Sequence, residues 1–128
     1  MNKEIELIAY EGKHFTIEWY FNEQQKSPAL EYYKNLNQDA RIQALKLFKR
    51  MGDVGKIMDK TKFTYEGNKI YAFKPKPNRF LCFFFEEKKI IVTNAFCKKQ
   101  QKLPSGERER AIKYREAYLY RKKGGYHA

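Results

Sequence analysis

The spacing of apolar residues changes along the chain and divides it into three parts. Near the N-terminus, apolar residues alternate with others over residues 5–10 and again over residues 15–21, which predicts one or two β-strands. Between residues 28 and 51 apolar residues recur every three or four positions, which predicts two helices. Short apolar runs typical of strands follow from residue 63, and the pattern of residues 107–122 predicts a last helix.

Residue types at the helix ends indicate where the two central helices begin and stop. Ser27 followed by Pro28 is typical of a helix start, because serine can accept a hydrogen bond from the first turn and proline fits there without an N–H. Asp39 can cap the second helix, and Gly52 is its expected stop. Joined at residues 37–38, the two helices are expected to form a hairpin lying on the sheet.

The second half of the chain contains four predicted strands, at residues 63–65, 70–73, 80–85 and 90–97. The last two are nearly continuous in apolar residues, as expected for central strands covered by helices on one side, and a polar loop at residues 86–89 joins them. The order of strand, two helices, strands and final helix predicts an α+β fold with an antiparallel sheet. A length of 128 residues fits a single domain over residues 1–128.

The distribution of charged residues along the chain indicates a kind of binding partner. Hydrophobic residues at 42% and aromatic residues at 16% favour a folded chain, although 33% of residues are charged. The net charge of +12 is uneven: residues 1–64 hold 11 basic and 9 acidic residues, and residues 65–128 hold 16 and 6. A polyanion that binds the second half is therefore expected. The alternative is a basic face that only keeps the protein soluble.

Other features narrow the class of protein. The longest apolar run, residues 80–85, is far shorter than the roughly 20 residues of a membrane helix. Charged residues directly after Met1 do not fit a signal peptide, so a cytoplasmic protein is expected. Cys82 and Cys97 lie in strand-like runs without Cys-x-x-Cys spacing and are expected to be buried thiols. The two histidines are far apart, so no metal or cofactor site is predicted.

Two cationic segments adjoin predicted strands, at residues 74–79 and 96–104. If the strand that ends at Cys97 pairs with the strand that begins near residue 80, both segments share one edge of the sheet. Lysine and arginine neutralise phosphate charge, and aromatic rings can stack on any base, so the set suits single-stranded RNA. The candidate residues are Lys74, Lys76, Arg79, Lys98, Lys99 and Lys102, with Phe96 and Tyr71 either stacking on bases or lying in the core.

The same segments resemble the RelE/HigB-type toxins, in particular their phage-related Gp49-like HigB branch. In that family a strand ends in aromatic-acidic-Leu-Arg-Pro, and a short basic turn and an arginine before apolar residues follow; residues 70–81 (IYAFKPKPNRFL) correspond. The family's next strand ends in Phe-x-Lys-Lys/Arg-x-Gln-Lys-x-Pro before a helix with Glu and Ala. Residues 96–104 (FCKKQQKLP), followed by Glu109 and Ala111, fit this pattern closely. The resemblance spans residues 63–120.

This resemblance implies a fold, an activity and a partner. The fold would be RelE-like, with a helix hairpin packed on a small antiparallel sheet and a C-terminal helix. Residues 1–12 would be an N-terminal extension or edge strand, and residues 122–128 a frayed basic tail. The activity would be that of a ribosome-dependent, metal-independent mRNA endonuclease, in which the RNA 2′-hydroxyl attacks the adjacent phosphorus. A cognate HigA-like helix-turn-helix antitoxin would neutralise it, by covering either the cationic site or an apolar edge of the sheet.

The resemblance also implies roles for the candidate residues. Lys74 and Arg79 would stabilise the charged phosphorus intermediate, and Lys98 or Lys102 would protonate the leaving oxygen. The residues in contact with the RNA would be Lys76, Lys99, Phe96 and Tyr71. Two positions depart from the family pattern: Ala72 replaces a common acidic residue, and Lys74 replaces an arginine and loses its bidentate fork. The alternative function is a non-catalytic RNA-binding or ribosome-binding module.

Overall fold

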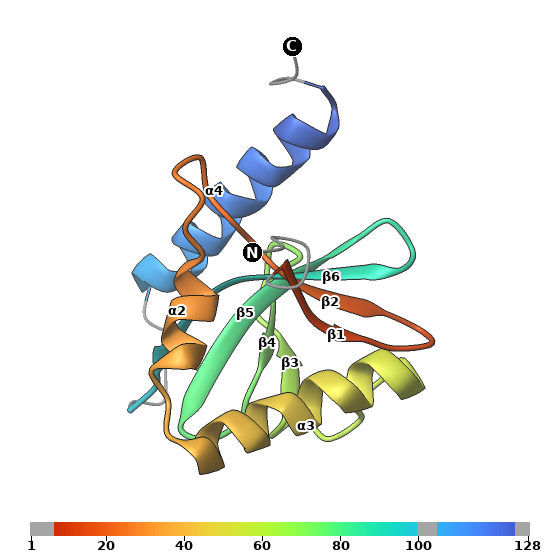
Figure 1. Cartoon of the computed structure of the whole chain (residues 1–128), viewed down its shortest axis with the longest axis vertical. Coiled ribbons are helices and arrows are strands. Elements are labelled where there is room, and N and C mark those ends of the chain that lie inside the picture. The colour runs from red at the N-terminus through yellow and green to blue at the C-terminus, as the bar shows by residue number, and fades with distance from the viewer. Residues whose placement is uncertain (1–6, 100–104, 125–128) are drawn as a thin grey trace.

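A mixed sheet of six strands, in the order β1-β2-β6-β5-β4-β3, runs through the molecule with helices on both faces (Figure 1). The computed structural model describes residues 7–99 and 105–124. The strands are β1 (Ile8–Glu11), β2 (Thr16–Trp19), β3 (Phe63–Tyr65), β4 (Tyr71–Phe73), β5 (Asn78–Phe85) and β6 (Lys89–Cys97). The helices are α2 (Pro28–Lys34), α3 (Gln38–Val54) and α4 (Ser105–Lys122). The predicted α+β class and the predicted C-terminal helix are confirmed.

Some predicted segments lie partly outside the described residues. These are residues 1–6, which include the start of the predicted N-terminal extension and first strand, residues 100–104 of the second cationic segment, and residues 125–128 of the predicted tail. Among the helices that the structure describes, none combines the length and the apolar character needed to cross a membrane.

One strand pair differs from the predicted antiparallel sheet, because β2 runs parallel to β6, with Thr16 opposite Lys89 and Trp19 opposite Val92. The other neighbouring strands are antiparallel. A parallel pair needs a long connection. The chain supplies one here, because two helices and three strands separate β2 from β6. The N-terminal hairpin can therefore pair with β6 in the parallel direction.

Side chains of the central strands alternate between two cores, one on each face of the sheet. On the α2/α3 face, strand residues pack against α2 and α3; on the α4 face, they pack against α4. Phe80 and Val92 belong to the first core, and Leu81 and Phe83 to the second. The sequence prediction of helices on one side only was wrong. A continuous apolar run is typical of a strand buried on both faces, and β5 and β6 are buried in this way.

The helix α2 begins as predicted, but the two central helices do not form a hairpin of parallel axes. The hydroxyl of Ser27 accepts a hydrogen bond from the backbone N–H of Leu30 at 3.2 Å, which caps α2. In Figure 1, α3 then leaves at a steep angle to α2 instead of running back alongside it. The guanidinium of Arg41 donates to the carbonyls of Lys34 and Leu36, at 3.3 and 2.5 Å, and so fixes the bend between the helices.

Both predicted ends of α3 were displaced. Asn37, and not Asp39, caps the helix, because its side chain accepts a hydrogen bond from the N–H of Ala40 at 2.8 Å. The helix continues through Gly52 and stops at Gly55, where φ is +90°, a conformation that glycine adopts without steric cost. Gly52 therefore has a role other than ending the helix.

Gly52 allows the turn between β1 and β2 to approach the backbone of α3. Its carbonyl oxygen accepts hydrogen bonds from the N–H groups of His14 and Phe15, at 2.7 and 3.1 Å. A methyl group on Gly12 would lie 2.2 Å from the carbonyl carbon of Gly52, far inside van der Waals contact. Two glycines that are far apart in the sequence thus make one close backbone contact.

Replacing Gly12 with alanine is expected to lower the free energy of unfolding by roughly 1–3 kcal/mol, because the new methyl group must displace the backbone of α3. Urea denaturation measures the change. Gly106→Ala is the matched control: this exposed helical glycine has no atom within 4 Å of an added methyl group, so its stability should stay level or rise slightly. Equal stability of the two variants would contradict the close packing of this turn on α3.

Arginines hold α4 to the rest of the fold, in addition to its apolar side. Three of them donate hydrogen bonds from their guanidinium groups to backbone carbonyls. The pairs are Arg108 with Glu66 at 2.9 Å, Arg115 with Asn68, and Arg121 with Phe21 at 2.8 Å. Much of the positive charge that the sequence places on this helix therefore anchors it.

Candidate nucleic-acid interface

The turn at residues 74–79 and the end of β6 lie side by side at one edge of the sheet. Arg79 in β5 is directly opposite Phe96 in β6. One step further, the backbone N–H of Lys98 donates to the carbonyl of Pro77 at 2.8 Å. The predicted meeting of the two cationic segments is confirmed as far as Lys98, whereas Lys102 lies outside the described residues.

Strand alternation places these cations on the α4 face. Phe80 points into the α2/α3 core and Leu81 into the α4 core, so Arg79 has the same direction as Leu81. Phe96, opposite Arg79, also packs in the α4 core. Lys74 follows Phe73 of the α2/α3 core, and the same alternation directs it to the α4 face.

Lys74 is at the centre of the positive charge. Its ammonium group donates to the carbonyl of Lys60 at 3.0 Å, and the residue is half-buried. Partial burial lowers the pKa of Lys74 from its ordinary value, and the positive charges of Arg79, Lys98 and Lys76 lower it further. Three other cations are therefore close enough to act on Lys74, and a bound anion would offset their repulsion of its charge.

Arg79 is also half-buried, and burial lowers its pKa. Its guanidinium donates to the adjacent carbonyl of Asn78 at 3.1 Å. Within the part of the chain that the structure describes, neither Arg79 nor Lys74 forms an ion pair with a carboxylate. Their charges are available to an anion from outside.

Glu66 belongs to this site although the sequence analysis did not select it. Its negative charge raises the pKa values of Lys74 and Arg79, against the effect of burial. The hydroxyl of Thr64 donates to the Glu66 carboxylate at 2.6 Å and holds it in place. The register of β3 and β4 places Glu66 at the site. Thr64 lies opposite Ala72, which packs in the α4 core, so Thr64 and Glu66 are also on the α4 face.

The turn itself is anchored from the other side of the sheet. Asn78 is only 5% exposed, and its side-chain oxygen accepts a hydrogen bond from the hydroxyl of Tyr32 in α2. The backbone N–H of Asn78 also donates to the carbonyl of Pro75 at 2.9 Å. These bonds fix the start of β5 and therefore the position of Arg79.

The remaining sequence candidates divide into surface and core residues. Lys76 and Lys99 are exposed beside the site, where they can contact a nucleic acid backbone. Phe96 is 8% exposed and packs in the α4 core. Tyr71 lies on the opposite face, its ring 5.6 Å from that of Phe63 and nearly parallel to it. The structure thus places Phe96 in the core and the partly buried Tyr71 against it, in line with the alternative that the sequence had left open.

The cysteines differ in exposure. Cys82 is buried in the α2/α3 core, as predicted, and burial raises the pKa of its thiol well above the ordinary value. Cys97 is exposed, so the prediction of a second buried thiol was wrong. It is the last residue of β6, at the edge where the core ends. A strand-like sequence pattern does not show which end of a strand projects beyond the helices.

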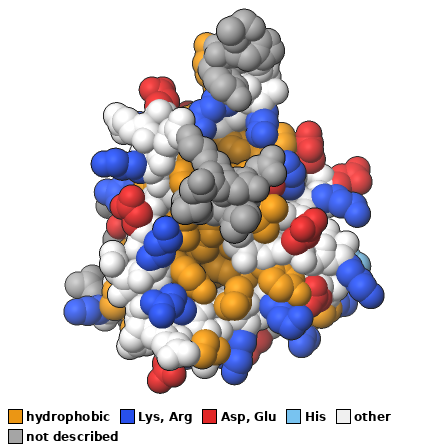
Figure 2. All heavy atoms as spheres, in the orientation of Figure 1, with side chains coloured by type: hydrophobic (Ala, Val, Ile, Leu, Met, Phe, Trp, Pro, Cys, Tyr) orange, Lys and Arg blue, Asp and Glu red, His pale blue; other side chains and the backbone are white. Residues whose placement is uncertain are grey.

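An apolar hollow of about 220 Å³ lies on the α2/α3 face, between α2, α3 and β1 (Figure 2). Its lining includes Trp19, Leu30, Tyr33, Leu45 and Phe48. β1 is the edge strand beside it. The two surfaces that an antitoxin is expected to cover, the cationic site and an apolar edge of the sheet, are therefore both present.

Comparison with known proteins adds a family to this geometry. Residues 31–116 match the model of the family described as phage derived protein Gp49-like (DUF891). The chain belongs to this family. Gp49-like proteins are RelE/toxin-like, and a toxin of this kind is expected to have an antitoxin partner. No curated protein matches the chain significantly. The match contains the turn at residues 74–79 and all of β6, which carry the candidate site.

Proposed function

We propose that this Gp49-like protein is a HigB-type toxin that cleaves mRNA on the ribosome without a metal ion. The observation that carries the proposal is the convergence of Lys74, Arg79 and Lys98 on one face of one sheet edge. Membership of a family of RelE/toxin-like proteins supports it. The expected partner is a HigA-like helix-turn-helix antitoxin encoded by a neighbouring reading frame.

In the proposed reaction the ribose 2′-hydroxyl loses its proton to water and attacks the adjacent phosphorus, and the bond from phosphorus to the 5′-oxygen of the next nucleotide breaks. Negative charge accumulates on the phosphorus oxygens during the attack. Arg79 and Lys74 stabilise that charge from half-buried positions, where water screens less than at an open surface. The ribosome holds the mRNA so that the attacking and leaving oxygens are in line.

The leaving oxygen needs a proton, and a lysine ammonium group can supply it. Lys98 is the candidate within the described residues, since its backbone is bonded to the turn that precedes Arg79. Lys102 is the second candidate. The exposed side chains of Lys76 and Lys99 bind neighbouring phosphates of the mRNA and help to position it.

A cell-free bacterial translation reaction tests this function. Purified protein is added with a reporter mRNA, and primer extension maps the ends that form. Cleavage is expected inside the reading frame, and the same RNA with a disabled start codon should stay intact. Binding to ribosomes with the mRNA intact would favour the non-catalytic ribosome-binding module. Absence of both cleavage and binding would reject either function.

A further inference from the structure

An extra residue in β6 changes which side chains face the candidate site. Asn94 is opposite Leu81, but the next pair along the ladder is Val92 with Cys82. Thr93 therefore has no partner on β5 and forms a β-bulge. Because side chains alternate with a period of two, one extra residue moves every later side chain of the strand to the other face.

Packing on either side of Thr93 shows this change of face. Before the bulge, even-numbered side chains enter the α2/α3 core, as Val92 does; after it, they enter the α4 core, as Phe96 does. Without the extra residue, Lys98 would point to the α2/α3 face, away from Arg79. The cationic site therefore depends on the bulge.

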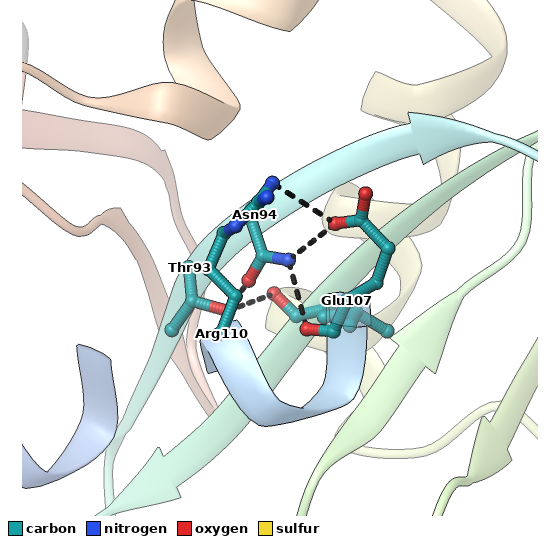
Figure 3. A network of polar contacts seen from close by, with 5 residues as sticks. Thr93, Asn94, Glu107 and Arg110 are labelled. Atoms are coloured by element: carbon teal, nitrogen blue, oxygen red, sulfur yellow. Dashed lines mark hydrogen bonds and ion pairs between the residues drawn. The ribbon is translucent and has the colours of Figure 1, made fainter. Parts of the chain in front are cut away.

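Asn94 links the bulge to the first turn of α4 (Figure 3). Its side-chain amide donates to the backbone carbonyl of Glu107 at 3.1 Å and to the Glu107 carboxylate at 2.9 Å. The hydroxyl of Thr93 lies 2.6 Å from the side-chain oxygen of Asn94 and 3.2 Å from the carbonyl of Leu81. Arg110 lies 3.5 Å from the same Glu107 carboxylate.

The strand end of this network is buried, since Thr93 is 0% and Asn94 is 1% exposed, whereas the side chains of Glu107 and Arg110 are 20% and 52% exposed. A polar group in such a place is costly unless its hydrogen bonds are made, and water does not replace a bond that is lost there. The bonds of Asn94 are made only when the bulge lies opposite the first turn of α4. The network therefore favours this one register of β6 over others with equal apolar burial.

We propose that Asn94 is a positioning residue: it fixes the bulge of β6 and thereby the face on which Lys98 is presented. This inference rests on the proposed nuclease function for its catalytic readout. Asn94 does not touch the RNA in this proposal; it acts through Lys98.

The test is a double-mutant cycle on the cleavage rate of translated mRNA, with N94L, K98A and the double variant. Leucine has the same branching of side-chain heavy atoms as asparagine but forms no hydrogen bonds. N94L is expected to lower the rate on the order of 100-fold by misplacing Lys98, and K98A by at least about as much. In the K98A background, N94L should have little further effect. Multiplied losses in the double variant, or an unchanged rate in either single variant, would overturn the proposal.

A matched control and a second measurement separate positioning from general stability. Arg121→Ala removes hydrogen bonds of α4 to Tyr20 and Phe21, so it should lower the melting temperature but keep the cleavage rate. NMR contacts between the ring of Phe96 and the α4 core should weaken in N94L, whether or not the protein cleaves RNA. Their full retention would overturn the role of Asn94. Cleavage absent from the unchanged protein would reject only the proposed function.

Discussion

Replacing Arg79 with alanine should lower the rate of mRNA cleavage by about 100- to 1,000-fold and remove growth arrest when the protein is produced in bacteria. The guanidinium group is half-buried on the α4 face and has no carboxylate partner within the described residues. Its positive charge is therefore available to the phosphorus intermediate, and in a half-buried position water is a poor substitute. The cell-free translation reaction measures the rate, and colony growth after induction measures the arrest.

Two further variants test whether the loss of cleavage is specific to the guanidinium group of Arg79. Arg79→Lys keeps the charge but loses the two-pronged hydrogen bond, so an intermediate rate is expected. Lys46→Ala removes one positive charge from an exposed position of α3, on the other face of the sheet, and should cleave like the unchanged protein. Undiminished cleavage by Arg79→Ala would reject the proposed site.

Replacing Phe48 with alanine should lower the free energy of unfolding by about 3–5 kcal/mol, the largest loss of stability expected for this fold. Phe48 is 0% exposed, and its ring centre lies 5.7 Å from that of Trp19, 4.9 Å from that of Phe73 and 5.7 Å from that of Phe80. It joins α3 to three strands, so its removal leaves a cavity that no single element can close. Urea denaturation followed by circular dichroism measures the loss.

Phe84→Ala is the matched control, because it makes the same chemical change on the same face of the sheet. Phe84 is 37% exposed, so less apolar surface returns to water and less than about half of the loss is expected. Similar losses for the two variants would show that Phe48 is not the centre of the core. Both phenylalanines lie on the α2/α3 face of the sheet and Arg79 on the other face, so the folded fraction of both variants should still cleave mRNA.

The elements of this fold could be predicted from the sequence to a large extent, because apolar spacing reports local structure directly. Both central helices, the four later strands and the last helix lie where the pattern predicted them. The parallel pairing of β2 with β6 could not be predicted, because contacts between distant strands leave no local signal. Gly52 misled the prediction for a physical reason: a glycine needed for close packing has the same appearance as one that ends a helix.

Part of the candidate site was also predicted, because some of its residues come together through local turns, whereas others depend on the pairing of strands. Arg79 and Lys98 could be brought together because a hairpin between β5 and β6 follows from a short polar loop, and Lys74 because a short turn joins β4 to β5. Glu66 could not be selected without the register of β3 and β4. The bulge at Thr93 could not be predicted from the sequence either. In a strand that is buried on both faces, an extra residue does not interrupt the apolar pattern.

The parallel pairing of β2 with β6 limits how far the chain can be shortened from its N-terminus without exposing the edge of the sheet. The family match begins at residue 31, so β1 and β2 lie outside it, yet Ile17 and Trp19 of β2 are core residues. If the chain were cut back to the matched region, β6 would become an outer strand with open backbone hydrogen-bonding groups, a template for self-association. The N-terminal hairpin thus covers the backbone edge of β6, the strand that leads into the candidate site, and the family-matched segment alone would leave that edge open.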